Sequence, residues 1–295
     1  MERDIWKRVT AALEKLPRTR RRNAVYSEPA VLAVVLWAVL HDRPIAWACR
    51  RGNWPMQAWR RDLPDQSTVS RRMRTFGFKR ALVRLMHILQ PIITPAEVAM
   101  LDGKAIMLGE FTTDPHARKG HGTGRMGIGY KLHLLKDTHG RVLAWRVATL
   151  NVAERTVALR LVRSAHRRGT LAPRAVIIAD AGYDSNKLHR LARELNLRMI
   201  MPRRRPGTGL GWRKHERGRL VSIRITEHRP VLWARLREIR SGIERFFGSL
   251  SWRGLYAPPP WVRRRHRMTT WVTCKLLITA AAHALKRDRE RTIAA

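Results

Sequence analysis

The stretch Ala175-Val176-Ile177-Ile178-Ala179-Asp180 is a run of five apolar residues that ends at an acid. Such a run, rich in β-branched residues, is typical of a strand buried on both faces of a sheet. Val98-Ala99-Met100-Leu101 is a second apolar run, and we predict that it ends in a turn at Asp102-Gly103. Open α/β sheets hold ligands at the carboxyl ends of their strands, so we expect Asp102 and Asp180 to lie close together.

The segments around these two strands alternate between strand and helix patterns. Further strands are predicted over residues 130–136, 141–149 and 197–201, and the turn at residues 137–140 makes a hairpin of the first two. A helix is predicted over residues 151–168, and Ser185 is expected to cap another. The pattern therefore predicts a mixed five-stranded α/β sheet flanked by helices.

The two ends of the chain read differently from this middle part. Residues 1–95 show helical spacing, and Pro64-Asp65 begins a short polar helix that could lie in a DNA major groove or simply face solvent. We expect an all-helical DNA-binding region over residues 1–95 and a catalytic domain over 96–290. A basic insertion is expected at about 202–230, with a small strand where Val221, Ile223 and Ile225 alternate. Residues 231–250 carry a helical apolar stripe that should face a core.

The charge of the chain is the strongest clue to its partner. The 295 residues include 60 Lys and Arg but only 22 Asp and Glu, for a net charge of +38. A genome biased toward Arg codons would explain Arg over Lys but not the scarcity of acids. A folded protein this basic points to a polyanion, above all nucleic acid. The two cysteines are isolated in the sequence, so we expect neither a zinc site nor a disulfide framework, and a reducing cytosol as the location. We see no secretion signal and no membrane span.

Because acids are scarce, their positions carry information. Two aspartates held close together need a cation between them, and oxygen ligands suit Mg²⁺ or Mn²⁺. Glu244, beside the apolar stripe and one turn after Arg240, could supply a third carboxylate for a two-metal site. Taken singly, each acid also has a plain structural interpretation as a turn residue, a helix cap or a surface ion pair. Asp184 is the main rival to Asp180, and we interpret it as a helix-start residue.

Six short motifs in this order resemble those of the DDE transposases of bacterial insertion sequences, of the insertion sequence 4/5 type with an RNase H-like domain. The resemblance covers residues 63–285. The motifs are Gln66-Ser67-Thr68-Val69-Ser70-Arg71, Leu101-Asp102-Gly103-Lys104, Gly129-Tyr130-Lys131-Leu132-His133, Asn151-Val152-Ala153-Glu154, Ala179-Asp180-Ala181-Gly182-Tyr183-Asp184, and Arg240 with Glu244-Arg245-Phe246-Phe247.

The resemblance implies that Asp102, Asp180 and Glu244 are the catalytic triad and that they bind two Mg²⁺ or Mn²⁺ ions. It implies metal-dependent cleavage at transposon ends and strand transfer by the freed 3′-hydroxyl. It places Lys131 near the DNA backbone. The full set of expected DNA contacts is Arg71, Arg72, Lys131, Arg203, Arg204, Arg205, Arg213, Lys214, Arg240, Arg245 and Arg253.

The sequence departs from the family pattern on the last helix, where relatives have Tyr and Lys and this chain has Arg237 and Ser251. The expected partners are double-stranded DNA at the transposon ends and at the target, with a homodimer in the synaptic complex. The expected location is the cytoplasm, at the nucleoid. The alternatives are a catalytically silent or repurposed DNA-binding protein and a plain nuclease on the same fold.

Overall fold

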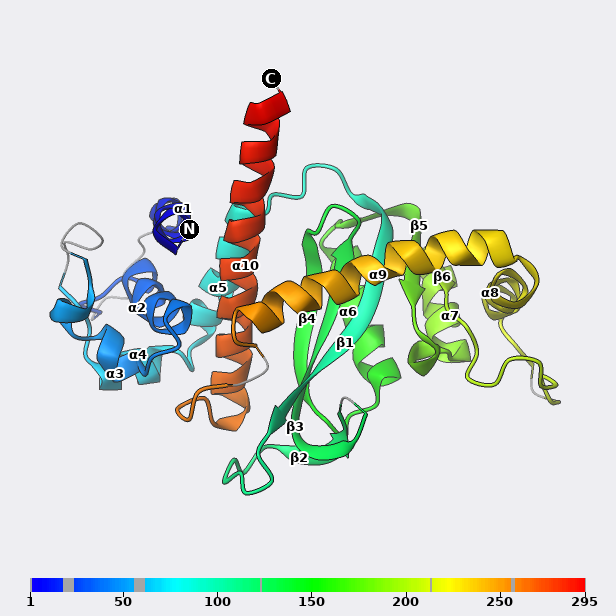
Figure 1. Cartoon of the computed structure of the whole chain (residues 1–295), viewed down its shortest axis with the longest axis horizontal. Helices are drawn as coiled ribbons and strands as arrows, with labels where there is room; N and C mark the ends of the chain where they lie inside the picture. Colours follow the sequence, from blue (N-terminus) through cyan, green and yellow to red (C-terminus); the bar gives the residue numbers. More distant parts are fainter. Residues whose placement is uncertain are drawn as a thin grey trace. The chain divides into compact units, whose positions relative to one another are not determined.

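The computed structural model describes residues 2–17, 24–55, 62–122, 124–212, 214–255 and 258–294. The chain divides into two units, whose elements are labelled in Figure 1. The helical unit comprises Met1–Pro91, Asp114–His116 and Leu250–Ala295, and the sheet unit comprises Ile92–Thr113 and Ala117–Ser249. In this division residues 250–295 group with the N-terminal helices.

The helical unit is built on the helix patterns that the sequence shows. Trp6 and Val9 of the first helix are buried, as its apolar spacing predicted. The predicted start at Asp65 is confirmed, since this residue is the N-cap of α4. The helices are α1 (Glu2–Glu14), α2 (Glu28–Leu40), α3 (Ile45–Ala48), η1 (Arg51–Asn53), α4 (Gln66–Arg72), α5 (Phe76–Leu89) and α10 (Arg264–Ala294).

The core of the helical unit forms around α2, which is apolar on all sides and almost wholly buried. Trp37 of α2 lies edge-on to Trp6 at 4.8 Å between ring centroids and stacks on Trp54 at 4.9 Å. On α10, the buried Lys275 forms an ion pair with Asp42 at 2.7 Å, which satisfies its charge inside the unit.

The sheet unit contains a mixed sheet in which β3 and β1 are antiparallel and β1, β5 and β6 are parallel. The order β2-β3-β1-β5-β6, with β4 also paired to β3, gives six strands among the described residues. The added strand is β2, which the sequence did not show. The elements are β1 (Ala96–Leu108), β2 (Arg118–His121), β3 (Met126–Asp137), β4 (Val142–Thr149), α6 (Glu154–Arg167), β5 (Leu171–Ala179), η2 (Ala181–Tyr183), α7 (Asn186–Glu194), β6 (Arg198–Ile200), α8 (Arg217–His228) and α9 (Pro230–Trp252).

Two local predictions in this unit were wrong. The strand that was expected to end at Asp102 continues to Leu108, because β3 pairs with β1 along its whole second half. The small strand expected around Ile223 is the helix α8. Its orientation is set by the buried Ser222, whose hydroxyl accepts from the Met201 N–H and donates to the Met201 carbonyl just after β6. The alternation of apolar residues there does not reflect alternating burial, since Val221 is exposed.

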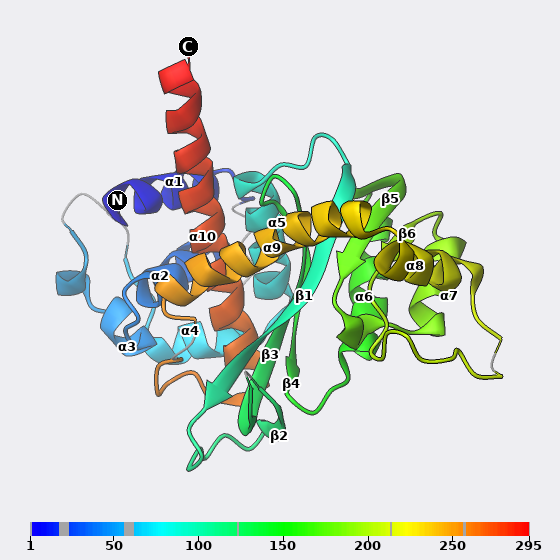
Figure 2. The ribbon, with the colours of Figure 1, turned by 45° about the vertical axis from the view of Figure 1, so that its right-hand side comes forward.

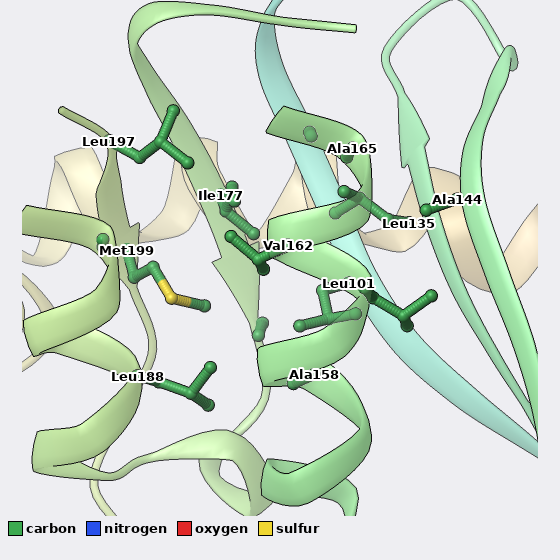
Figure 3. Close-up of a cluster of buried hydrophobic side chains, with 14 of the residues drawn as sticks. Leu101, Leu135, Ala144, Ala158, Val162, Ala165, Ile177, Leu188, Leu197 and Met199 are labelled. Atoms are coloured by element: carbon green, nitrogen blue, oxygen red, sulfur yellow. The ribbon is translucent and has the colours of Figure 1, made fainter. Parts of the chain in front are cut away.

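Helices cover the two faces of the sheet, as expected for an RNase H-like fold. Residues of α6 and α7 pack with Leu101 and Ile177 in one apolar cluster (Figure 3). The alternate residues of β1 face the other way, toward α9: Met100 lies beside Gly242 of that helix. Figure 2 shows α9 crossing β1 on this second face. The predicted apolar stripe of α9 is buried at Ile243 and Phe246 but exposed toward the start of the helix, at Leu232.

Candidate catalytic site

Two adjacent parallel strands bring Asp102 and Asp180 together, as the sequence predicted. Leu101 of β1 and Ala179 of β5 are paired in register, and an aspartate follows each of them. Neighbouring strands lie about 4.8 Å apart, so the two carboxylates arise from adjoining positions. Asp180 follows the end of β5 and accepts a hydrogen bond from Gly182 N at 2.7 Å. Asp102 lies within β1 and accepts from Gly103 N, also at 2.7 Å.

The environment of these two acids disfavours their charged forms. The pKa of Asp102 is raised to about 6, mainly by burial and also by the negative charges of Asp180 and Glu154, against the opposing effects of the Gly103 N–H and Arg240. Burial and the charge of Glu154 likewise raise the pKa of Asp180. The pair is therefore a buried site of negative charge with too little compensating positive charge, which a bound cation would stabilise.

The third carboxylate, Glu244, is joined to the first through Arg240. One guanidinium nitrogen of Arg240 lies 3.4 Å from Asp102 Oδ2, and the other lies 2.7 Å from Glu244 Oε1. Arg240 and Glu244 are one helical turn apart on α9, and the ion pair that the sequence allowed as an alternative to a catalytic role is present. The side chain of Glu244 is 57% exposed, and that of Arg240 is 23% exposed.

A buried lysine of the sheet holds α9 over Asp102. Lys136 of β3 donates a hydrogen bond from Nζ to the carbonyl oxygen of Gly242 at 3.1 Å. Its ammonium group also lies over the ring of Phe246. Burial lowers the pKa of Lys136 to about 8. Because Gly242 precedes Glu244 by two residues, this contact fixes the part of the helix that carries the third acid.

Sequence reasoning missed the role of Glu154, the first residue of α6. Glu154 accepts from Lys131 Nζ at 2.8 Å, and its charge acts on both aspartates. A methyl group added at Gly182 would lie 2.5 Å from Glu154 Oε2 and 3.0 Å from Asp180 Oδ1, so both acids border the same small space. The motif that contains Glu154 was visible in the sequence, but nothing in its spacing indicated a place beside Asp180.

Tyr183 is a second residue at the site that the sequence did not single out. Its side chain is fully buried, its hydroxyl has no hydrogen-bond partner within the described structure, and burial raises its pKa well above the ordinary value. The charges of Glu154, Asp102 and Asp180 all act on it. A methyl group added at Gly103, the residue after Asp102, would lie 3.3 Å from this hydroxyl.

Asp184, the rival to Asp180, lies in a different environment. Both of its oxygens accept hydrogen bonds from the guanidinium of Arg219, at 2.8 and 2.6 Å. Its side chain is only 7% exposed. Asp184 therefore joins the end of η2 to α8. Asp114 and Asp137 are also occupied, since Asp114 accepts from His116 N and Asp137 from Arg141 N.

The donor set of Asp102, Asp180 and Glu244 suits a hard divalent cation such as Mg²⁺ or Mn²⁺, because all of its ligand atoms are carboxylate oxygens. The raised pKa values of the two aspartates fit the same interpretation. Among the described residues, however, no three acidic, His or Cys side chains are grouped closely enough to hold a metal ion. The two aspartates, which already lie side by side, are therefore the prepared part of the site, while the carboxylate of Glu244 is paired with Arg240.

The expected DNA contacts fall into two groups. Arg71, Arg204, Arg205, Lys214 and Arg245 are exposed. The others are engaged within the protein: Arg72 pairs with Glu28, Lys131 with Glu154, Arg203 with Glu227 and Arg240 with Asp102 and Glu244, while Arg253 is half-buried and burial lowers its pKa. Arg213 lies outside the described residues.

The fold and this site define an RNase H-like α/β protein with an aspartate on each of two neighbouring parallel strands, within β1 and just after β5. The sequence model of a family described as "Transposase DDE domain" matches residues 94–255, more than half of the chain. The chain belongs to this transposase family.

Two other comparisons add little to this assignment. A search of curated proteins finds no match. A solved structure described as the cryo-EM structure of the piggyBac transposase synaptic complex with hairpin DNA is similar, with a TM-score of 0.49 and 12% sequence identity. The similarity covers 97% of this chain and 73% of that one. Within the part of the chain that the structure describes, none of the helices combines the length and the apolar character needed to cross a bilayer.

Proposed function

We propose that this protein is an insertion-sequence transposase that cuts DNA at the ends of its element and joins the freed 3′-hydroxyl to a target. Asp102, Asp180 and Glu244 act as the catalytic carboxylates. The observation that carries the proposal is the pair of buried aspartates on adjacent strands, both with raised pKa values. A purely structural pair of acids would have its own positive partners, as Asp184 has in Arg219.

The three carboxylates would hold two Mg²⁺ or Mn²⁺ ions. Such ions, when bound, activate the attacking oxygen and stabilise the leaving oxygen of a phosphodiester. Asp102 and Asp180 supply anionic oxygens from the rigid sheet. Glu244 supplies its carboxylate oxygens from α9 once its ion pair with Arg240 is broken. Arg240, so released, binds a phosphate close to the cut. The Lys131–Glu154 ion pair keeps the second aspartate in position and is not itself a ligand.

The exposed basic residues are the proposed contacts to the DNA backbone. Arg204, Arg205 and Lys214 lie on the loop before α8, and Arg245 lies on α9 next to the third acid. Trp212, fully exposed on the same loop, is placed to stack on an unpaired base. Arg72, Arg203 and Arg253 are engaged or half-buried, and we assign them to the folded structure instead.

The remaining parts of the proposal concern the organisation of the complex. The helical region of residues 1–95 would read the terminal repeats, with the exposed Arg71 of α4 among its contacts. The catalytic domain would occupy residues 96–290, with the basic insertion at about 202–230. Two ends must be handled together, so a homodimer is expected at synapsis on the DNA of the nucleoid.

The experiment that tests the proposal is end cleavage. The purified protein is incubated with DNA that carries the sequences flanking its own gene, in Mg²⁺, Mn²⁺ or EDTA. Glu244→Gln is compared with Glu238→Gln, which removes an exposed acid from the same helix. We expect metal-dependent nicking at the element end in the wild-type and Glu238→Gln proteins, and none in Glu244→Gln. Tight DNA binding without cutting in any metal would instead indicate a silent or repurposed DNA-binding protein.

A further inference from the structure

A groove lined with arginines lies on the α6 and α7 side of the sheet unit, on the face that α9 does not cover. Its volume is about 590 Å³. It is lined by Arg160, Arg163 and Arg167 of α6 and by Arg146 of β4, and Leu191 of α7 and Leu195 just after that helix form the other wall. Glu194 is the one acidic residue of this lining among the described residues.

The arrangement of the α6 arginines follows from the pattern of the helix. Residues 160, 163 and 167 recur at helical spacing, so they share one face of α6. All three side chains are exposed, while Leu161 and Val162 are buried on the opposite side of the helix. With a rise of about 1.5 Å per residue, the row extends for about 10 Å.

These arginines differ from Arg203 of the loop before α8 and Arg219 of α8, each of which has an acidic partner. Arg203 is paired with Glu227, and Arg219 with Asp184. For Arg160, Arg163 and Arg167, no ion pair and no side-chain hydrogen bond is present within the described residues. Concentrated positive charge without internal compensation opposes folding, unless an external anion offsets it.

We propose that this groove binds the phosphodiester backbone of a duplex DNA segment other than the one that is cut at the carboxylates. Guanidinium groups form paired hydrogen bonds with phosphate oxygens. Along the duplex axis each strand carries one phosphate per about 3.4 Å, so a row of about 10 Å laid along the axis would face roughly three phosphates. The identity of the ligand as DNA rests on the proposed transposase function.

The position of the groove separates it from the cleaved DNA. Arg240 and Glu244 lie on α9, which packs on the Met100 face of β1, whereas α6 packs on the Leu101 face. Duplex DNA has a persistence length of about 50 nm, so one short duplex does not bend readily around the sheet to reach both faces. The groove therefore receives either the target DNA or donor DNA beyond the cut.

The first test is the salt dependence of binding to a random-sequence duplex, measured by fluorescence anisotropy. The double variant Arg163→Gln/Arg167→Gln is compared with Arg174→Gln/Arg198→Gln, which removes two exposed arginines of the sheet unit outside the groove. Each lost phosphate contact lowers the slope of log K against log salt by about 0.9, so we expect a decrease of about 1.8 in the groove variant. The control should keep the wild-type slope, as should Arg163→Lys/Arg167→Lys.

An unchanged slope in the groove variant, or an equal decrease in the control, would overturn the proposal. A second result would also overturn it. In that result the wild-type protein binds an acidic polypeptide such as polyglutamate, and the groove variant loses its affinity for the polypeptide but keeps its affinity for DNA. These measurements need no cleavage, so they remain decisive even if the wild-type protein fails to cut DNA and the proposed function falls.

The second test distinguishes the two sources of DNA in a protein that cuts. Strand transfer is measured at saturating donor DNA while the target concentration is varied. The groove is assigned to target DNA if the groove variant cleaves ends normally but needs a several-fold higher target concentration than the wild type for half-maximal joining. A parallel loss of end cleavage assigns it to the donor flank. Equal joining and cleavage in groove and control variants would exclude a second DNA segment from this groove.

Discussion

Asp180 and Asp184 lie four residues apart, yet their side chains have opposite electrostatic environments. Asp184 is almost buried and accepts two hydrogen bonds from Arg219. Asp180 has one backbone donor, Gly182 N, and another acid, Glu154, as a neighbour that raises its pKa. An acid with its own arginine contributes to the fold, whereas an acid placed among acids is available to an external cation. The predictions below test this distinction.

The largest effect is expected on catalysis, from Asp102→Asn or Asp180→Asn. Each change removes an anionic oxygen from the prepared part of the site, so we expect nicking to fall by on the order of 10³-fold. The folded structure should persist, because burial already disfavours the charged form of both groups. Single-turnover nicking in Mg²⁺ measures the rate, and duplex binding in EDTA provides the control. Near-normal nicking by either variant would remove that residue from the triad.

The opposite pattern is expected for Asp184→Asn. This change leaves the guanidinium of Arg219, only 15% exposed, without its carboxylate. Loss of one partner of a buried ion pair typically costs about 3 kcal/mol of unfolding free energy. The folded variant should still cut DNA within a few-fold of the wild-type rate. Urea unfolding and nicking are measured on the same preparation, and a stable but inactive Asp184→Asn would reverse our choice of aspartate.

A smaller effect on the rate is expected from Gly182→Ala, which disturbs the position of Asp180 without changing any charge. The added methyl group would lie 2.5 Å from Glu154 Oε2 and 3.0 Å from Asp180 Oδ1, so at least one carboxylate must move. A displacement of this size is expected to lower nicking by about tenfold to a hundredfold. The Mn²⁺ concentration that half-saturates the protein should rise as well. Electron paramagnetic resonance of free Mn²⁺ measures this concentration.

Gly248→Ala is the matched control for that prediction. Gly248 lies on α9, and an added methyl group meets no atom within 4 Å. In a helix the change should stabilise the protein by about 0.5–1 kcal/mol and leave nicking and Mn²⁺ binding unaltered. If Gly182→Ala leaves nicking and Mn²⁺ binding unaltered, as this control should, then the close approach of Glu154 and Asp180 to Gly182 does not fix their positions.

The same comparison explains how much of the site could be predicted from the sequence. The two apolar runs, the aspartate after each run and the helix that carries Glu244 are local patterns, and the structure has all of them. Arg219 and Asp184 are 35 residues apart in the chain, so no local pattern could pair them. Glu154 was hidden for the same reason, because its nearness to Asp180 depends on how α6 packs against the sheet.

The wrong predictions also have physical causes. The Asp102-Gly103 pair resembles a turn, but ten residue pairs with β3 hold β1 extended through it. The alternation of Val221, Ile223 and Ile225 resembles a strand, but the segment is the helix α8, which the hydrogen bonds of Ser222 to Met201 fix beside the end of β6. In both cases a partner distant in the sequence outweighed the local preference of the chain.

The smallest predicted effect concerns Lys136, the positively charged counterpart of the buried aspartates. Burial lowers its pKa to about 8, and its ammonium donates to the Gly242 carbonyl. In the unfolded chain this lysine keeps its proton up to its ordinary pKa near 10.4. Between the two values the unfolded state binds more protons, so the contribution of Lys136 to stability rises with pH.

The variant Lys136→Met isolates that contribution. Relative to the wild type, Lys136→Met should lose the rise of about 1–2 kcal/mol in unfolding free energy between pH 8 and pH 9.5. Urea unfolding of both proteins at each pH gives the difference, and Lys104→Met, which changes a less buried lysine of β1, is the control. Parallel pH profiles for wild type and Lys136→Met would mean that the lysine is solvated in solution. The contact with Gly242 would then not hold α9, and the position of Glu244 would need another support.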